Sequence, residues 1–411
     1  MTTPAVAVTG IGIVNPCGTG TEPFFRAVLA GKPAITPLTR FNHTLSPAHV
    51  AGQIHAFPAH EFMTARQCAQ TGPLAQFALA AAAMALSDAG LEAAAHDPLR
   101  CGVSLGIGSG SWSDLENGLD SLYRTSAPAM GRSVGTGWFA GAALGQISIR
   151  HALRGFSRTY AAGRASGASA VHQAVRSILS GRNDVVLAGG SEASLTPLGI
   201  AFHGAADSLA PSHDPATAYL PFDRQRTGTV LGEGSTILVL ESAGHARQRG
   251  ARIYGTIESS AMATTTPAAD GTATALTASL TQAGLAPPQI GAVFPESCGT
   301  PHGDQNEAHA IRTALGTAAP ATPLCTPKSL YGHLQGASFP TELACALLAL
   351  RHGELPPCAP ALVPDPALGI TLVTQRQPLR SGTAAVLAHS HEGLSFAVTV
   401  RAPLTAPKEQ K

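Results

Sequence analysis

The sequence is poor in charged residues and in paired cysteines, and each shortage excludes a class of protein. Only 12% of the 411 residues are charged and the formal net charge is +1, with no block of one sign. We therefore expect neither nucleic acid nor a membrane surface as an electrostatic partner. The seven cysteines are odd in number and form no C-x-x-C pair, which favours a reducing cytoplasm over a disulfide framework.

Targeting, membrane and cofactor signals are also missing. The first residues, MTTPAVAVTG, contain no basic segment followed by a long apolar one, and no run of about 18 apolar residues occurs. The sequence thus predicts a cytoplasmic protein with neither a signal peptide nor a membrane span. The glycines at 228, 232 and 234 precede a strand rather than a helix, so they do not form a dinucleotide fingerprint. No metal-spaced set of histidines and cysteines is present, and we expect neither a metal nor another cofactor.

What the chain does contain is 44% hydrophobic residues, 44 glycines and 31 prolines, typical of many short elements joined by tight turns. Short apolar runs alternate with alanine-rich stretches, which predicts an α/β fold around a buried sheet. The halves, 1–255 and 256–411, follow one plan and are predicted as two domains. The predicted strands are 5–11, 103–107, 158–162, 184–189, 235–241, 253–259, 290–294, 384–389 and 396–401, and the predicted helices are 22–29, 71–89, 115–123, 137–150, 165–179, 273–284, 304–315 and 340–352.

The first candidate site is GRASGASAVHQAV, Gly163 to Val175. A predicted strand enters a glycine turn and then a helix rich in small residues. A side chain at such a turn points into the cleft at the sheet edge, near the positive end of the helix dipole, where a thiol would ionise readily. The residue there is Arg164, whose guanidinium stays protonated and cannot be a nucleophile. The alternative is an ordinary surface arginine at a helix start.

Two further loops carry polar residues after predicted strands. In PESCGTPHGDQNEAHA, residues 295–310, Cys298 and His302 could form a thiol–base pair, but we favour a turn in which Asp304 caps the next helix and Glu307 completes a capping box. In TPKSLYGHLQGAS, residues 326–338, Lys328 and His333 lie in a glycine-rich loop. A ring nitrogen of His333 could donate a hydrogen bond to an oxyanion.

Taken together, these stretches resemble the β-ketoacyl synthase family of the thiolase fold, and the match extends from VAVTGIGIVNPCG to the last strand. The segments DVVLAGGSEA, YLPFDRQRTGTVLGEG and PKSLYGHLQGA are specific to it. The resemblance implies a thiolase-like fold of two duplicated halves in α-β-α-β-α layers. It places Arg164 at the position of the acyl-accepting cysteine and Cys298 at that of the first catalytic histidine. Lys328 and His333 match the family's lysine and second histidine, and His389 falls near its gating phenylalanine.

The replacement of the acyl-accepting cysteine and of the first catalytic histidine is similar to the pattern of the chain-length factor, the ketosynthase β subunit, of type II polyketide synthases. Such a subunit is non-catalytic, pairs with an active ketosynthase as a heterodimer, and shapes the acyl tunnel that receives chains built from units on an acyl carrier protein. The resemblance places tunnel or gate residues on 109–123, and the i, i+3, i+7 spacing puts Trp112, Leu115 and Leu119 on one helical face. Two departures from that branch favour a reduced, polyene-type product over an aromatic one: Arg164 stands where glutamine is usual, and the lysine and histidine loop is retained.

Three alternatives remain open at this point. The chain could decarboxylate malonyl carriers to supply starter units, using His333 without a thiol. It could condense acyl groups with Cys298 as a displaced nucleophile. It could also be a purely structural partner that stabilises a ketosynthase and leaves product length unchanged.

Overall fold

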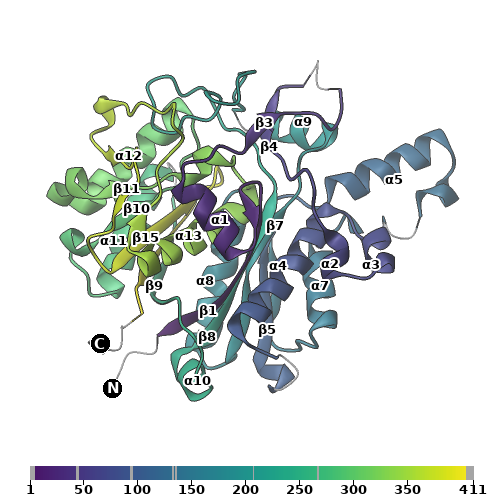
Figure 1. The fold of residues 1–411 in the computed structure, drawn as a ribbon, viewed down its shortest axis with the longest axis horizontal. Helices are drawn as coiled ribbons and strands as arrows, with labels where there is room; N and C mark the ends of the chain where they lie inside the picture. Colours follow the sequence, from purple (N-terminus) through teal and green to yellow (C-terminus); the bar gives the residue numbers. More distant parts are fainter. Residues whose placement is uncertain are drawn as a thin grey trace.

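The computed structural model describes residues 5–42, 46–92, 96–131, 134, 137–206, 208–265 and 268–403. Within these residues twelve strands form one mixed sheet in the order β13-β11-β10-β15-β16-β9-β1-β8-β7-β5-β6, with β2 beside β1 (Figure 1). The strands of this sheet are β1 (Val6–Asn15), β2 (Gly18–Thr19), β5 (Cys101–Gly106), β6 (Ser157–Tyr160), β7 (Val185–Glu192), β8 (Gly234–Ser242), β9 (Gly255–Thr264), β10 (Ala292–Phe294), β11 (Pro323–Leu324), β13 (Thr371–Leu372), β15 (Thr383–His389) and β16 (Leu394–Arg401).

The sheet has two similar halves. In the first, β6, β5 and β7 are parallel and β8 and β1 continue antiparallel. In the second, β13, β11, β10 and β15 are parallel, and β16 and β9 continue antiparallel. A short antiparallel ladder, Val6 opposite Ile257 to Val8 opposite Gly255, joins β1 to β9. The division into domains at residues 255 and 256 stays a prediction.

Helices cover the two halves in layers. Helices α8 (Ser166–Leu179) and α13 (Ser338–His352) lie between them, since α8 packs on β5 and β7 while α13 contacts β15 and β8. Helices α4 (Pro73–Ala89) and α7 (Gly141–Arg150) cover the outer face of the first half, and α11 (Ala268–Gln282) and α12 (Pro301–Leu315) that of the second (Figure 1). The expected α/β, thiolase-like arrangement of α-β-α-β-α layers is confirmed.

Small residues explain why α4 lies so close to β1. A Cβ atom added at Gly12 of β1 would lie 1.9 Å from the carbonyl oxygen of Ala81 in α4, so only glycine fits there. The alanines of α4 present little bulk on the facing side. The sequence pattern of glycine in the strand and alanine in the helix thus sets the spacing of these two layers.

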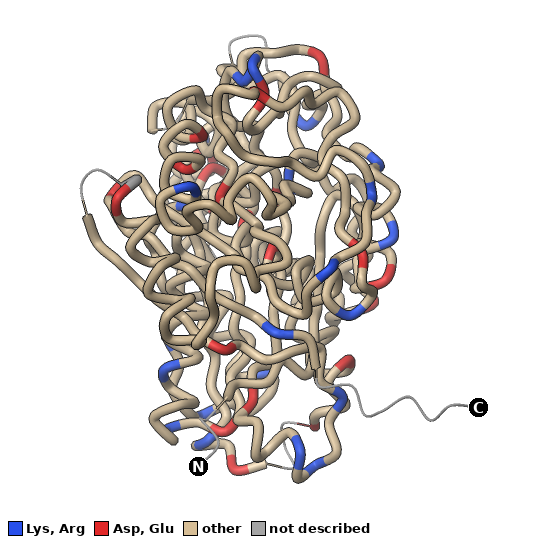
Figure 2. The backbone as a smooth tube through the Cα atoms, turned by 90° about the vertical axis from the view of Figure 1, so that its left-hand side faces the viewer, with Lys and Arg blue, Asp and Glu red and all other residues tan. Residues whose placement is uncertain are grey.

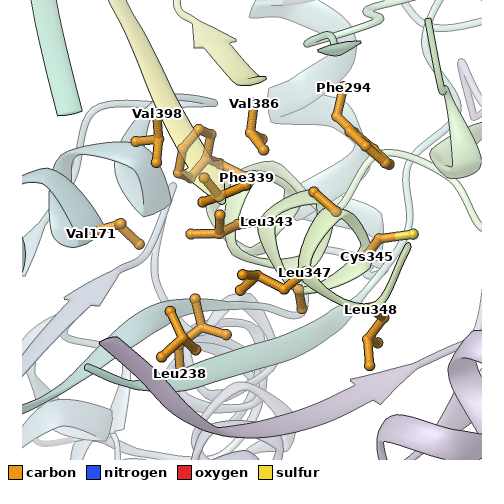
Figure 3. Close-up of a cluster of buried hydrophobic side chains, with 14 of the residues drawn as sticks. Val171, Leu238, Phe294, Phe339, Leu343, Cys345, Leu347, Leu348, Val386 and Val398 are labelled. Carbon is orange, nitrogen blue, oxygen red and sulfur yellow. The ribbon is translucent and has the colours of Figure 1, made fainter. Parts of the chain in front are cut away.

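The main core surrounds α13. Phe339, Leu343 and Leu347 project from this helix toward Val171 of α8 and Leu238 of β8 (Figure 3), and all five side chains are fully buried. Val386 and Val398 cover the same helix from the second half of the sheet. Burying such side chains contributes about 1.5–3 kcal/mol each, so the packing holds the two halves together.

Several short elements complete the described chain, and one helix projects from it. Helix α5 (Trp112–Arg124) extends away from the body (Figure 1). The other elements are α1 (Thr21–Leu29), β3 (Ile35–Pro37), β4 (Val50–Gly52), α2 (Ala59–Phe62), α3 (Ala65–Gln70), α9 (Pro197–Ala206), α10 (Ala243–Gln248), β12 (Glu354–Leu355) and β14 (Gln377–Pro378). Charged residues are sparse and mixed in sign over the side seen in Figure 2. Among the described helices none is both long and apolar enough to cross a membrane.

Candidate functional site

The turn that enters α8 places Arg164 inside the protein. Gly163 has φ +52°, a left-handed conformation that glycine adopts without a Cβ clash. Ser166, the first residue of α8, holds the turn: its hydroxyl donates to the Gly163 carbonyl at 2.7 Å and accepts from the Ala162 amide at 2.8 Å. The Arg164 side chain then lies in the interior, with only 4% of the residue exposed. The alternative of a surface arginine is therefore wrong.

The Arg164 guanidinium reaches the loop after β10. Its Nη2–H donates to Thr229 Oγ1 at 3.0 Å, and the Thr229 hydroxyl donates in turn to the Cys298 carbonyl at 2.5 Å. The two positions singled out on different loops, Arg164 and Cys298, are thus brought together through one threonine. A charged hydrogen bond of this kind holds the cation in a defined place.

Lys328 and His333 also come together, around a residue that the sequence analysis missed. Glu296, which follows β10, accepts a hydrogen bond from His333 at 2.5 Å, and its backbone carbonyl accepts one from Lys328 Nζ at 2.6 Å. The Lys328 ammonium lies 4.0 Å from the other Glu296 carboxylate oxygen. All three side chains are fully buried. Lys328 and His333 lie 32 and 37 positions after Glu296 in the sequence, so no local sequence pattern signals these two contacts.

The hydrogen bonds of His333 fix the position of its ring proton. The Gln335 amide donates to Nδ1 at 3.0 Å, so Nδ1 accepts and Nε2 carries the hydrogen that goes to Glu296. Burial lowers the pKa of His333 to about 4, so its ring is neutral at pH 7. Burial alone would raise the pKa of Glu296, but Lys328 and His333 outweigh it and lower that pKa to about 2. The Nε2–H of His333, which was expected to donate to an oxyanion, therefore donates to the carboxylate of Glu296.

Cys298 is a buried thiol beside acceptors rather than beside a base. Its Sγ lies 3.4 Å from Thr300 Oγ1 and 3.5 Å from Asp304 Oδ1. Burial, reinforced by the Asp304 charge, raises the pKa of the Cys298 thiol to about 12. The other member of the suggested thiol–base pair, His302, is exposed at the start of α12. This environment disfavours a thiolate.

The prediction that Asp304 caps α12 is wrong. The helix begins at Pro301, and its N-cap is Thr300, whose hydroxyl accepts from the Gly303 amide. Asp304 is instead a fully buried acceptor for the amides of Phe222 and Gly299, at 2.7 and 2.9 Å. The predicted helix begins at residue 304, whereas the observed one begins three residues earlier, at Pro301. Proline is favoured at the first position of a helix, because its missing N–H has no partner there in any case.

Glu307 is likewise an internal acceptor and not part of a capping box. Its carboxylate oxygens receive the amides of Glu296 and Ser297 at 2.6 and 2.8 Å, and thereby shape the loop that carries Cys298. Burial raises the pKa of Glu307 to about 8. His389, at the end of β15, has its Nε2 4.0 Å from this carboxyl group, and burial lowers the pKa of His389 to about 4.

Two cavities meet at Arg164 and His391. The first, which we call the histidine cavity, has a volume of about 260 Å³. The second, which we call the α9 cavity, has a volume of about 410 Å³. The histidine cavity is lined by Arg164, Thr272, Cys298, Thr300, His302, Gly303, Asn306, Glu307, His389, Ser390 and His391. The α9 cavity is lined by Gly108, Ala161, Ala162, Gly163, Arg164, Phe202, His203, Ala206, Gln335, His391, Glu392 and Leu394.

The four predicted gate residues do not share one cavity. His389 lines the histidine cavity, whereas Trp112, Leu115 and Leu119 line neither cavity and are half-buried on α5. The Trp112 ring instead packs on Phe202 of α9, with ring centroids 5.0 Å apart. The described residues contain no group of three or more histidine, cysteine or acidic side chains that could hold a metal.

Comparison with known proteins links this geometry to one family. Residues 3–246 match the model of the β-ketoacyl synthase N-terminal domain, and residues 251–361 match that of the C-terminal domain. The chain is 38% identical over 410 residues to the tetracenomycin polyketide synthase ketoacyl synthase beta subunit of Streptomyces glaucescens, covering 98% of this chain and 99% of the relative. It is 33% identical over 377 residues to 3-oxoacyl-[acyl-carrier-protein] synthase 2 of Vibrio cholerae, covering 90% and 91%.

Solved structures show the same fold. The ishigamide ketosynthase/chain length factor superposes with a TM-score of 0.88 at 26% identity, covering 97% of this chain and 99% of that one. The same TM-score, identity and coverage hold for AntDE:AntF, described as a type II polyketide synthase acyl-carrier protein in complex with its ketosynthase bound to the hexaketide. Both resemblances extend over nearly the whole chain.

Proposed function

Because the chain belongs to the β-ketoacyl synthase family, we propose that it is the non-catalytic chain-length factor of a type II polyketide synthase. It pairs with an active ketosynthase and shapes the tunnel into which the partner's acyl chain grows. The observation that carries the proposal is the buried Arg164 in the turn that enters α8, where we take the family's acyl-accepting cysteine to be replaced. A guanidinium stays protonated, so it cannot attack a thioester.

The surroundings of Cys298 and His333 support the same function. Burial raises the pKa of the Cys298 thiol to about 12, and a neutral thiol at the proposed position of the first histidine offers no base. His333 donates its ring N–H to Glu296, which leaves that hydrogen unavailable to an oxyanion. This arrangement also disfavours the decarboxylase alternative. Incubation of the purified chain with malonyl carrier should yield no acetyl carrier, whereas rapid release of acetyl carrier would favour a decarboxylase.

Heterodimer formation is supported by the edge of the sheet. Strand β6 pairs with β5 on one side and ends the order of the sheet. Trp138, Phe139 and Ile149 lie in or just before α7, which packs on β6, and they are 47%, 60% and 83% exposed. An open sheet edge beside exposed apolar side chains is typical of a surface that a partner covers. We propose that the ketosynthase pairs along β6 and extends the sheet through both subunits.

Helix α5 and the loop after β15 are the proposed tunnel elements. Trp112, Leu115 and Leu119 lie on the projecting α5, and His389 lies at the end of β15. A chain that meets bulky wall residues pays an overpacking cost of about 1–3 kcal/mol for a further two-carbon unit. Since about 1.4 kcal/mol is a factor of ten, this cost is enough to set product length. The reduced, polyene-type product stays a prediction.

A subunit exchange tests the function. One ketosynthase is reconstituted with this chain and, in parallel, with the β subunit of another synthase, using the same carrier protein and malonyl supply. We expect the two pairs to give different product lengths by mass spectrometry. Identical lengths from both pairs would favour the purely structural partner and contradict the proposal.

A further inference from the structure

We propose that a third cavity, beside the start of β6, receives a carboxylate side chain of the partner ketosynthase, held by Arg176 and Arg182. The inference rests on the proposed function and adds a charged contact that neither the sequence analysis nor the comparisons assign. The cavity, which we call the arginine cavity, has a volume of about 250 Å³. It is lined by Phe156, Gln173, Arg176, Ser177, Ser180 and Arg182.

The arginine cavity lies at the open edge of the sheet, on the side of α8. Phe156 directly precedes β6, and the other lining residues belong to α8 or follow it by at most three positions. Helix α7, beside the exposed apolar side chains described above, packs on the same strand from the outer face. A partner that pairs along β6 would therefore cover an apolar surface on one face of the edge and the arginine cavity on the other.

The polar groups of the arginine cavity suit an anion. The hydroxyls of its two serines donate to Asn183 Oδ1 and to a backbone carbonyl, at 2.7 and 3.0 Å. The hydrogen-bond donors that remain are the guanidinium N–H groups of Arg176 and Arg182 and the side-chain amide of Gln173. None of the six lining residues is acidic. Two guanidinium groups facing one cavity are well suited to bind a carboxylate, because their N–H groups can donate in pairs.

The positive charges here are not neutralised within the chain. Among the residues that the structure describes, no acidic side chain forms an ion pair with Arg176, Arg182 or Arg158. Arg158, in β6, lies opposite Ser104, whose hydroxyl donates to a carbonyl of α8, so Arg158 stands on the α8 side of the sheet. By contrast, Arg100 pairs with a carboxylate of the same chain.

The end of α8 explains only part of this charge. Cations near the last turn of a helix interact favourably with its dipole, which accounts for Arg176 and Arg182 one at a time. It does not account for Arg158, which lies on a strand. Three like charges gathered at one edge also repel one another, so a counter-charge from outside the chain would stabilise them.

The same charges make a second copy of this chain a poor occupant. Two copies paired antiparallel along β6 by a two-fold axis would form one continuous sheet, with neighbouring strands about 4.8 Å apart and both α8 sides on one face. The Arg158 side chains of the two copies would then lie on neighbouring strands, and like charges so placed are destabilising. A ketosynthase that presents a carboxylate to Arg176 and Arg182 replaces this repulsion by charged hydrogen bonds.

Charge variants of the purified chain test the contact. The Kd for the ketosynthase used in the subunit exchange is measured by biolayer interferometry, after circular dichroism confirms that each variant is folded. The double variant Arg176→Glu with Arg182→Glu should raise the Kd at least about tenfold, because it opposes the partner's carboxylate with like charges. The matched control is Arg247→Glu at an exposed arginine of α10, a helix that packs on β1 and β8, and its Kd should stay within about twofold of wild type.

A milder double variant separates binding from helix stability. Arg176→Gln with Arg182→Gln removes the charges but keeps polar side chains. It should flatten the dependence of the Kd on salt between about 50 and about 500 mM NaCl, since it removes two charges that salt would screen. A role confined to the stability of α8 would leave this salt dependence unchanged.

Weaker binding of the glutamate variant, a flatter salt dependence of the glutamine variant and an unchanged control support the inference. Wild-type affinity and salt dependence in both variants overturn it. Self-association of the wild-type chain that the glutamine variant weakens would assign the cavity to a second copy, and would also overturn it. If the subunit exchange changes product length while these variants bind normally, the arginine cavity is excluded but the chain-length function stands. If the exchange changes nothing, the function itself fails.

Discussion

Replacing Lys328 by methionine tests how much the buried contact between Lys328 and Glu296 contributes to stability. The Lys328 ammonium donates to the Glu296 carbonyl at 2.6 Å and lies 4.0 Å from the Glu296 carboxylate, and neither residue has exposed surface. Methionine has a similar apolar length but no charge. Lys328→Met therefore leaves a buried carboxylate without its principal cation, while changing the packing little.

The expected cost follows from two independent estimates. Removing one partner of a buried ion pair costs about 3–5 kcal/mol, because the other charge stays desolvated. The pKa of Glu296 falls from its ordinary 4.5 to about 2 in the folded protein, which corresponds to about 3 kcal/mol of stability at neutral pH. Because the folded-state pKa is the lower one, this stability is present above about pH 4.5 and is lost as the pH falls toward 2.

Urea unfolding at one fixed protein concentration, followed by circular dichroism, measures the effect. Lys328→Met should lower the free energy of unfolding by about 3 kcal/mol or more. Lys32→Met at the exposed Lys32 is the matched control and should stay within about 0.5 kcal/mol of wild type. The double variant Lys328→Met with Glu296→Gln removes both charges and should recover part of the loss. A loss at Lys328 no larger than that at Lys32 would refute the electrostatic account of this cluster.

Three further outcomes follow from the site. Arg164→Cys should restore no condensation, because His333 still donates to Glu296; acylation of the new thiol together with formation of β-ketoacyl product would contradict this. Cys298, with its thiol pKa raised to about 12, should resist iodoacetamide at pH 8 in the native protein, as read by peptide mass spectrometry, and stoichiometric labelling would show the burial argument to be wrong. Trp112→Ala should lengthen the dominant product of the reconstituted pair, and an unchanged distribution would remove Trp112 from the length-setting machinery.

Local pattern was enough to predict most of the fold. The alternation of short apolar runs with alanine-rich stretches located most of the longer elements, as with the predicted 165–179 and the observed α8, Ser166–Leu179, whereas α9 and the short elements β3, β4, α2, α3 and α10 were not predicted. The strand–glycine–helix pattern gave a buried Arg164 as one of two alternatives, beside a surface arginine, and did not decide between them. These features depend on periodicity and turn chemistry, which neighbouring residues determine.

The contacts that define the site could not be predicted in this way. Glu296 pairs with His333 across 37 positions, and Asp304 accepts the amide of Phe222 across 82. Glu296 lies in the loop after β10 and Asp304 in the first turn of α12, where a solvated acid or a helix cap would fit the sequence equally well. The α9 cavity is a further example, since Phe202 and Ala162 line one cavity only after the sheet and α9 have packed.

The location of acyl groups in the reconstituted pair tests the central claim most directly. The heterodimer is incubated with labelled malonyl carrier, quenched during turnover and digested, and each acylated residue is identified by mass spectrometry. We predict that acyl groups are found on the ketosynthase cysteine and the carrier and on no residue of this chain, and that this chain alone forms no carbon–carbon bond. An acyl group covalently bound to this chain, or β-ketoacyl product from this chain alone, would contradict the account.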